Sequence, residues 1–180
     1  MIGTAKPETL LLVSPDSFHQ REYYDMMAEW SQDKGRIIPS ALVSGNLSYD
    51  EWLTRERKFE SEDTCPKGKV PCNLYFLTRM SDGKIVGASS IRWKLNKGLL
   101  HSGGHIGYGI RPSERGKGYG TRQLGLILEK CRERKMDQVL VTCQEGNIAS
   151  QKIILNNGGV LENTVTTPQG ETFFRYWVKL

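Results

Sequence analysis

The sequence predicts a mixed α/β fold, in which an antiparallel sheet is followed by alternating strands and helices. Two strand-like segments, residues 74–80 and 84–94, are joined by a Ser-Asp-Gly turn that is typical of a hairpin. Residues 121–134 carry apolar side chains at helical spacing, with charged residues on the opposite side. Residues 139–143 form a continuous apolar run that suits a buried strand. These observations together favour helices packed against one sheet.

The first third of the chain is predicted to hold one strand and two helices. Residues 8–13 are strand-like, and Ser14 followed by proline predicts the cap of a helix over residues 16–32. Ser48, with a glutamate three residues later, forms a capping box for a second helix. The charged residues 60–72 also contain glycine and proline, which predicts an exposed loop.

The remaining elements alternate and then end in a hairpin. Residues 105–110 form a short strand before the helix described above, and Asn147 opens a further helix that a Gly-Gly pair ends. Residues 160–165 and 172–178 are predicted to pair across a Pro- and Gly-containing turn. The last strand, over residues 173–179, looks exposed and could pair across a two-fold axis, which predicts a homodimer.

Composition places the chain among ordinary globular domains. Its 180 residues suffice for one domain with a core, and its 38% apolar and 25% charged content exclude the disordered and membrane classes. No apolar run reaches the roughly 18 residues of a spanning helix and no signal peptide is evident, so we expect a cytoplasmic protein without a membrane partner. The four cysteines form no C-x-x-C pair and no cluster with histidine, which predicts reduced thiols and no metal site.

The net charge of +5 is concentrated at a glycine-rich turn. Arg111, Arg115, Lys117 and Arg122 lie close together in this stretch, against Glu114 alone. Such clustering favours a phosphate-containing ligand at the turn. No basic stretch interleaved with aromatic residues is present, so we expect no nucleic-acid partner.

Residues 115–120 form this turn between a strand and a helix, which is a general device for binding anions. The first helical turn leaves amides unpaired, the helix dipole makes that end positive, and glycine lets the backbone approach phosphate oxygens. The spacing excludes two nucleotide-binding motifs. A dinucleotide fingerprint would need glycine in place of Thr121 or Gln123. A P-loop would need glycine in place of Arg111 and a hydroxyl in place of Gly118.

The turn instead fits the pattern Arg-x-x-Gly-x-Gly, at Arg115, Gly118 and Gly120. A second block opens with Asn147, continues with Ile-Ala-Ser and ends at Gly158. With a helix and a buried strand between them, the two blocks resemble the GNAT-type N-acetyltransferase superfamily. The resemblance implies a twisted, mostly antiparallel sheet with a splayed pair of parallel strands, flanked by helices.

The resemblance also implies a single GNAT-like acyltransferase domain over residues 1–180. Residues 1–70 would form its acceptor side and residues 74–180 its cofactor-binding core. The co-substrate would be acetyl-CoA, with the pantetheine between the splayed strands and the pyrophosphate on the glycine-rich turn. Asn147 is alternatively a simple helix cap. The implied cofactor contacts are Ile110, Arg111, Arg115, Gly116, Lys117, Gly118, Tyr119, Gly120, Thr121, Asn147 and Ser150.

By resemblance, the reaction is direct attack of a neutral amine on the thioester carbonyl, with a backbone N–H near Ile110 for the oxyanion. Many members carry a tyrosine general acid seven residues after the helix-opening asparagine, and here that position is Ile154. The candidate catalytic residues are therefore Tyr108, His105 and Glu145. Strand alternation places the first two on opposite faces. The alternatives are a packed aromatic for Tyr108, a hydrogen-bonded strand-end histidine for His105, and a solvated carboxylate for Glu145.

The acceptor is the least visible part of the predicted site. In the superfamily, the first two helices and the loop after them shape the acceptor pocket, and acidic residues there either hold a cationic amine or are solvated. We expect an N-acetyltransferase that acts on the primary amine of a small molecule. A protein amine as acceptor, or a non-catalytic acyl-CoA-binding regulatory module, are the alternatives. The aromatic and acidic residues of this region are Tyr23, Trp30, Trp52, Phe59, Glu60, Glu62 and Asp63.

Overall fold

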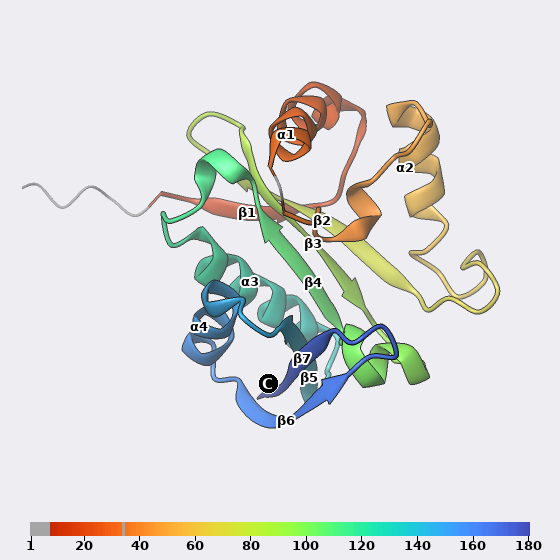
Figure 1. The fold of residues 1–180 in the computed structure, drawn as a ribbon. Helices are drawn as coiled ribbons and strands as arrows, with labels where there is room; N and C mark the ends of the chain where they lie inside the picture. The colour runs from red at the N-terminus through yellow and green to blue at the C-terminus, as the bar shows by residue number, and fades with distance from the viewer. Residues whose placement is uncertain (1–7, 34) are drawn as a thin grey trace, which may run out of the picture.

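A seven-stranded sheet in the order β1-β2-β3-β4-β5-β7-β6 forms the centre of the molecule (Figure 1). The structure is a computed structural model that describes residues 8–33 and 35–180. Neighbouring strands are antiparallel except β4 and β5, which are parallel, so the predicted mixed α/β fold is confirmed. The strands are β1 (Leu10–Val13), β2 (Cys72–Arg79), β3 (Ile85–Arg92), β4 (Ile106–Ile110), β5 (Gln138–Gln144), β6 (Val160–Thr166) and β7 (Thr172–Lys179).

Helices cover both faces of this sheet (Figure 1). Helices α1 and α2 pack on β2 and β3 through stacked aromatic rings, with Trp52 between Tyr23 and Phe76. Helices α3 and α4 lie on the other face, where Leu124 and Ile154 are buried in the core with β5 and β7. Each face therefore has its own core. The helices are α1 (Gln20–Gln32), α2 (Tyr49–Arg57), α3 (Tyr119–Glu133) and α4 (Ile148–Asn156).

Helix α1 begins later than predicted. Asp16, rather than Ser14, is the cap: its carboxylate accepts a hydrogen bond from the Phe18 amide at 2.9 Å, and His19 completes a capping box. A carboxylate suits a helix start because it complements the positive end of the dipole. This cap opens a short 3₁₀ turn, and α1 follows it. The predicted capping box at Ser48 is confirmed at the start of α2.

Strand β7 is an interior strand. It pairs with β5 on one side and with β6 on the other. The expectation that residues 173–179 form an exposed edge strand is therefore wrong, because the β6–β7 hairpin folds back so that its second strand joins the sheet. The homodimer itself stays a prediction. The edge on this side is β6, on which Val160 and Leu161 are exposed.

Two of the four cysteines are part of the hydrophobic core. Cys131 and Cys143 are buried in the core of α3 and β5, and all four cysteines of the described chain are free. None of the helices in the described ranges combines the length and the apolar character that crossing a membrane requires. Within residues 8–33 and 35–180, no three His, Cys, Asp or Glu side chains are grouped as metal ligands.

Candidate active site

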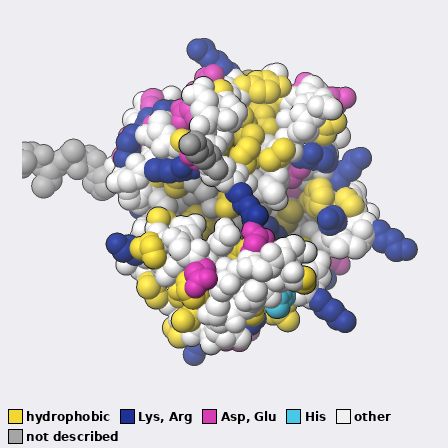
Figure 2. Space-filling model, in the orientation of Figure 1, with side chains coloured by type: hydrophobic (Ala, Val, Ile, Leu, Met, Phe, Trp, Pro, Cys, Tyr) yellow, Lys and Arg dark blue, Asp and Glu magenta, His cyan; other side chains and the backbone are white. Residues whose placement is uncertain are grey.

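A cavity of about 880 Å³ lies where β4 and β5 diverge. These parallel strands share one pair in register, Ile106 with Val141, and separate beyond it. The walls come from β4, the glycine-rich turn, the start of α4 and the segment of residues 35–40 after α1. Figure 2 shows the opening as a groove between the half that carries α1 and α2 and the half that carries α4 and β6.

His105 lies at the closed end of this divergence. Its backbone N–H donates to the Leu140 carbonyl at 2.8 Å, and its Nδ1 accepts from the Leu140 N–H at 2.9 Å. Burial lowers the pKa of His105 to about 4, so the ring is neutral near pH 7. Among the described residues, His105 is not part of the cavity wall. This geometry favours the structural alternative, in which His105 joins the two strands where they separate.

The backbone of β4 offers polar groups to the cavity. The Arg111 N–H donates to Val86 on β3, and alternate residues of a strand direct their N–H and C=O to the same side. Tyr108 and Ile110 therefore direct theirs toward β5, which has already separated. The Ile110 carbonyl accepts a hydrogen bond from Nε of Arg115 at 3.2 Å. This edge can hydrogen-bond an extended, amide-containing ligand.

The glycine-rich turn presents a set of free amides at one end of the cavity. Gly116 and Gly118 both have φ of 78°, in the left-handed region that favours glycine. In the part of the chain that the structure describes, no backbone amide from Gly116 to Thr121 donates a hydrogen bond to another protein group. Helix α3 begins here, so its dipole adds positive potential. The turn therefore has the geometry of a phosphate site.

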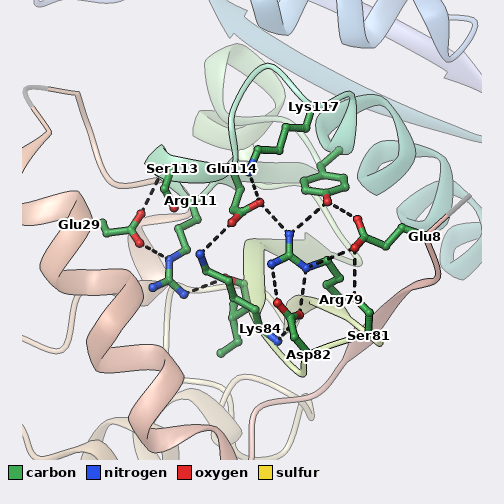
Figure 3. A network of polar contacts seen from close by, with 12 residues as sticks. Glu8, Glu29, Arg79, Ser81, Asp82, Lys84, Arg111, Ser113, Glu114 and Lys117 are labelled. Atoms are coloured by element: carbon green, nitrogen blue, oxygen red, sulfur yellow. Dashed lines mark hydrogen bonds and ion pairs between the residues drawn. The ribbon is translucent and has the colours of Figure 1, made fainter. Parts of the chain in front are cut away.

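Glu114 lies beneath this turn and ties it to the β2–β3 hairpin (Figure 3). Its carboxylate is 3% exposed and accepts hydrogen bonds from Lys117 and Lys84 at 2.8 Å and from Arg79 at 2.9 Å. Burial by itself would raise the pKa of Glu114, but these cations bring it down to about 2. The Lys117 amine is thus held by Glu114 and lies outside the cavity wall, which leaves its backbone amide for a ligand.

The role of Glu114 is not among the sequence-based expectations. One feature of the sequence could have indicated this role, because Glu114 is the single acidic residue in the basic stretch around the turn. An acid at that place is expected to be paired, since it would otherwise repel a phosphate ligand.

Arg111 points away from the cavity. Its guanidinium hydrogen-bonds Glu29 at 2.7 Å (Figure 3). It also hydrogen-bonds Glu22 at 3.0 Å, and both glutamates lie on α1. Glu29 also accepts a hydrogen bond from the Ser113 amide at 3.1 Å. The predicted cofactor contact of Arg111 is therefore corrected for its side chain, which instead holds α1 against the start of the turn. Its partners lie 82 and 89 residues away in the sequence, so no local pattern reveals them.

Tyr108 and Ser150 meet in the wall of the cavity. Their hydroxyl oxygens are 2.9 Å apart, and burial raises the pKa of Tyr108 while the hydrogen bond with Ser150 opposes that rise. Asn147 Oδ1 accepts from the Ser150 amide at 3.0 Å, so Asn147 caps α4 and also lines the cavity. Ile154 is fully buried in the core, so a side chain at this position faces the core.

Trp30 and the segment after α1 close the opposite side of the cavity. A Cβ atom on Gly109 would lie 2.3 Å from the Ile38 carbonyl oxygen, so glycine lets this segment cross β4 closely. Glu145 is exposed and lies outside the wall, which favours its solvated alternative. Of the other aromatic and acidic residues expected on the acceptor side, Tyr23 and Trp52 lie in the core, and Phe59, Glu60, Glu62 and Asp63 lie outside the cavity.

The model of the Acetyltransferase (GNAT) domain family matches residues 11–160. The chain belongs to this family. The predicted resemblance and the predicted class of enzyme, an acyltransferase, are thereby confirmed. A search of curated protein sequences found no match.

Solved structures of acetyltransferases share the fold of this GNAT domain. A ribosomal-protein alanine acetyltransferase from Vibrio fischeri has a TM-score of 0.69 at 14% identity, over 94% of this chain and 91% of its own. An acetyltransferase from Salmonella typhimurium that modifies the N-terminal serine of a 50S ribosomal subunit protein has a TM-score of 0.68 at 14% identity, over 96% and 95%. A microcin self-immunity acetyltransferase, in complex with acetyl-CoA and AMP, has a TM-score of 0.68 at 16% identity, over 97% and 94%.

Proposed function

We propose that this GNAT domain transfers the acetyl group of acetyl-CoA to the primary amine of a small molecule. The observation that carries the proposal is one continuous cavity, which joins the free amides of the glycine-rich turn to the unpaired edge of β4. A pyrophosphate suits the first feature, and the amides of pantetheine suit the second. The microcin self-immunity acetyltransferase was solved with acetyl-CoA, which supports the same co-substrate here.

The cofactor contacts in this proposal come from three elements that share the cavity. The turn and the start of α3 hold the pyrophosphate, β4 holds the pantetheine, and the start of α4 contacts it from the other side. Lys117 takes part through its amide. The remaining proposed contacts line the cavity and are Ile110, Arg115, Gly116, Gly118, Tyr119, Gly120, Thr121, Asn147 and Ser150.

The reaction begins with attack of a neutral amine on the thioester carbonyl carbon. A C–N bond forms, a backbone N–H of β4 near Ile110 stabilises the oxyanion, and the C–S bond then breaks. The hydroxyl pair of Tyr108 and Ser150 gives a proton to the thiolate, and the proton that the amine loses returns to the pair through water. His105 acts through its hydrogen bonds to Leu140 as a positioning residue, and Glu145 takes no part.

One domain binds both the acceptor amine and the cofactor in this proposal. Residues 1–70 form the acceptor side, which is supported by the wall that Trp30 and residues 35–40 contribute. Residues 74–180 form the cofactor-binding core, which is supported by the turn, β4 and α4.

A protein N-terminus is the second candidate acceptor. Two structural neighbours are named for modifying ribosomal proteins, and the cavity opens to the surface as the groove of Figure 2. A small amine is favoured because the segment of residues 35–40 crosses β4 closely and narrows the acceptor side.

The proposal is tested first by thermal unfolding with acetyl-CoA and with acetyl-pantetheine, which lacks the pyrophosphate. Saturating acetyl-CoA should raise the Tm by about 5–10 °C, and acetyl-pantetheine by much less. Release of the CoA thiol is then measured with small amines and with N-terminal peptides. If only the peptides are acetylated, the acceptor is a protein N-terminus and not a small amine. Tight acetyl-CoA binding without any turnover would favour a regulatory module, and no shift at millimolar acetyl-CoA would overturn the proposal.

A further inference from the structure

Arg92 lies in the wall of the cavity on the side away from Tyr108. It is the last residue of β3, and a Cβ atom on Gly107 would lie 3.5 Å from its Nη2 and 3.6 Å from Pro39. The guanidinium therefore covers the face of β4 that the segment after α1 also covers. Its Nη1 donates hydrogen bonds to the carbonyls of Gly103 and Gly104, at 3.2 Å each, and these bonds fix the orientation of the guanidinium.

The positive charge of Arg92 has no counter-ion in the described chain. In residues 8–33 and 35–180, no carboxylate forms an ion pair with it. Burial lowers the pKa of Arg92, which shows that its surroundings disfavour the charge. A partly buried cation without an anion is costly, so an anionic ligand would be stabilising here.

The acidic side chains in the cavity wall are already paired with cations. Asp33 forms an ion pair with Arg115 at 2.7 Å, and Glu114 is held by the cations beneath the turn. Arg36, the other arginine on this side, is paired with Glu171 at 2.6 Å. Among the described residues, the acceptor side thus offers a cation without a partner and no carboxylate without one, which disfavours an acceptor with a second positive charge.

A second unpartnered donor lies on the same face. Trp30 is 2% exposed, and its indole N–H has no hydrogen-bond partner among the described residues. Its ring lies 3.4 Å from the Cβ position of Gly109, two residues along β4 from Gly107. A buried donor without an acceptor is unfavourable, and a ligand oxygen that reached this N–H would satisfy it.

We infer that the acceptor amine carries an anionic oxygen group, a carboxylate or a phosphate, that binds Arg92 at the acceptor end of the cavity. The inference rests on the proposed function, because it describes the second substrate of the same reaction. The planar guanidinium matches either oxyanion through two N–H groups. Within the residues that the structure describes, the acceptor side holds no free carboxylate that would keep the amine protonated, which suits attack by a neutral amine.

The test compares amines that differ in this group alone. Release of the CoA thiol is measured with glycine against glycinamide, β-alanine against β-alaninamide, and ethanolamine phosphate against ethanolamine. The anionic member of at least one pair should have a kcat/KM at least about tenfold higher. The amino-acid pairs and the ethanolamine pair distinguish a carboxylate from a phosphate.

Variants of Arg92 separate binding of the anion from folding. Arg92→Gln should raise the KM of the anionic amine about 10- to 100-fold and leave that of its neutral partner unchanged. Arg92→Lys should restore part of the preference. Arg36→Gln is the matched control, since it removes a cavity-wall cation that is already paired, and it should leave the preference unchanged.

The outcomes distinguish the two proposals. Equal use of anionic and neutral amines, or an equal loss for both in Arg92→Gln, would overturn the inference and leave the acetyltransferase proposal intact. If no amine reacts, calorimetry with CoA-loaded protein still decides the inference, because N-acetylglycine should bind wild type more tightly than N-acetylglycinamide and lose that advantage in Arg92→Gln. Failure of acetyl-CoA itself to bind would count against the proposed function separately.

Discussion

At the scale of single residues, the hydroxyl pair of Tyr108 and Ser150 is the candidate proton source for the leaving thiolate. Burial raises the pKa of Tyr108, so its phenol stays protonated at neutral pH and can donate. Tyr108→Phe should lower kcat about 100-fold and leave the KM for acetyl-CoA nearly unchanged, because the ring still packs. Steady-state kinetics measure both constants. Tyr75→Phe, on β2 and outside the cavity wall, is the control and should have wild-type kinetics; an unchanged kcat in Tyr108→Phe would remove this residue from the mechanism.

The lowered pKa of His105 predicts how the free energy of unfolding depends on pH. Its folded pKa of about 4 lies below the ordinary value of 6.5, so the unfolded chain binds this proton more readily. The contribution of His105 is complete above pH 6.5 and is lost as the pH falls toward 4, by about 3 kcal/mol at most. Urea unfolding of His105→Gln should therefore show lower stability at pH 7 and a flatter decline between pH 6.5 and 4.5.

His101→Gln is the control for this measurement, because His101 is exposed and lies outside β4. Its unfolding should follow the pH dependence of the wild type. A wild-type slope in His105→Gln would show that other groups cause the decline.

The residues of the cavity differ in whether their roles could be predicted from the sequence. The glycine-rich turn and the Asn147 block could be found because their function depends on the backbone and on local spacing. The directions of the Arg111 and Lys117 side chains could not be predicted, because each side chain binds a carboxylate that only the folded structure brings near. Arg111 binds Glu29 on α1, and Lys117 binds the buried Glu114. Arg92 carries no sequence signal at all, because its lack of a partner is a property of the folded cavity.

At the scale of elements, the turn before α3 is expected to depend on the left-handed conformation of Gly118. A side chain at φ of 78° costs about 1–2 kcal/mol even where space is open, and relief of that strain would rotate the amides that face the phosphates. Gly118→Ala should raise the Kd for acetyl-CoA about tenfold or more, measured by calorimetry. Gly83→Ala, at φ of 70° in the open β2–β3 turn, should cost similar stability and leave the Kd unchanged. Equal Kd values for both variants would contradict the assignment of the turn.

Local patterns predicted most elements because periodicity and capping act over a few residues. The amphipathic α3, the β2–β3 hairpin and the Ser48 cap of α2 all follow from such patterns. The position of β7 did not follow, since strand order depends on pairing with β5 some thirty residues earlier, and an apolar strand looks alike at an edge and in the interior. The prediction of where α1 starts was wrong because two residues near its start, Ser14 and Asp16, can both cap a helix.

At the scale of the whole molecule, the single pair between β4 and β5 divides the sheet into two parts that the cofactor would bridge. Strands β1 to β4 lie on one side of the cavity and β5 to β7 on the other (Figure 1). A ligand in the cavity should slow hydrogen exchange where it covers free amides, because those amides have no protein partner. Acetyl-CoA should therefore protect residues 116–121, the outer half of β4 and the start of α4, and leave β1 and the β2–β3 turn unchanged.

Pantetheine provides the matched ligand for this exchange experiment, since it lacks the pyrophosphate. It should protect the amides of Tyr108 and Ile110 and leave those of residues 116–121 as they are in the free protein. Protection of the turn by pantetheine would contradict the placement of the phosphates. Protection confined to β5 and β7 would contradict the placement of the cofactor arm on β4, because the edge of β4 that faces the cavity is the one whose polar groups lack partners.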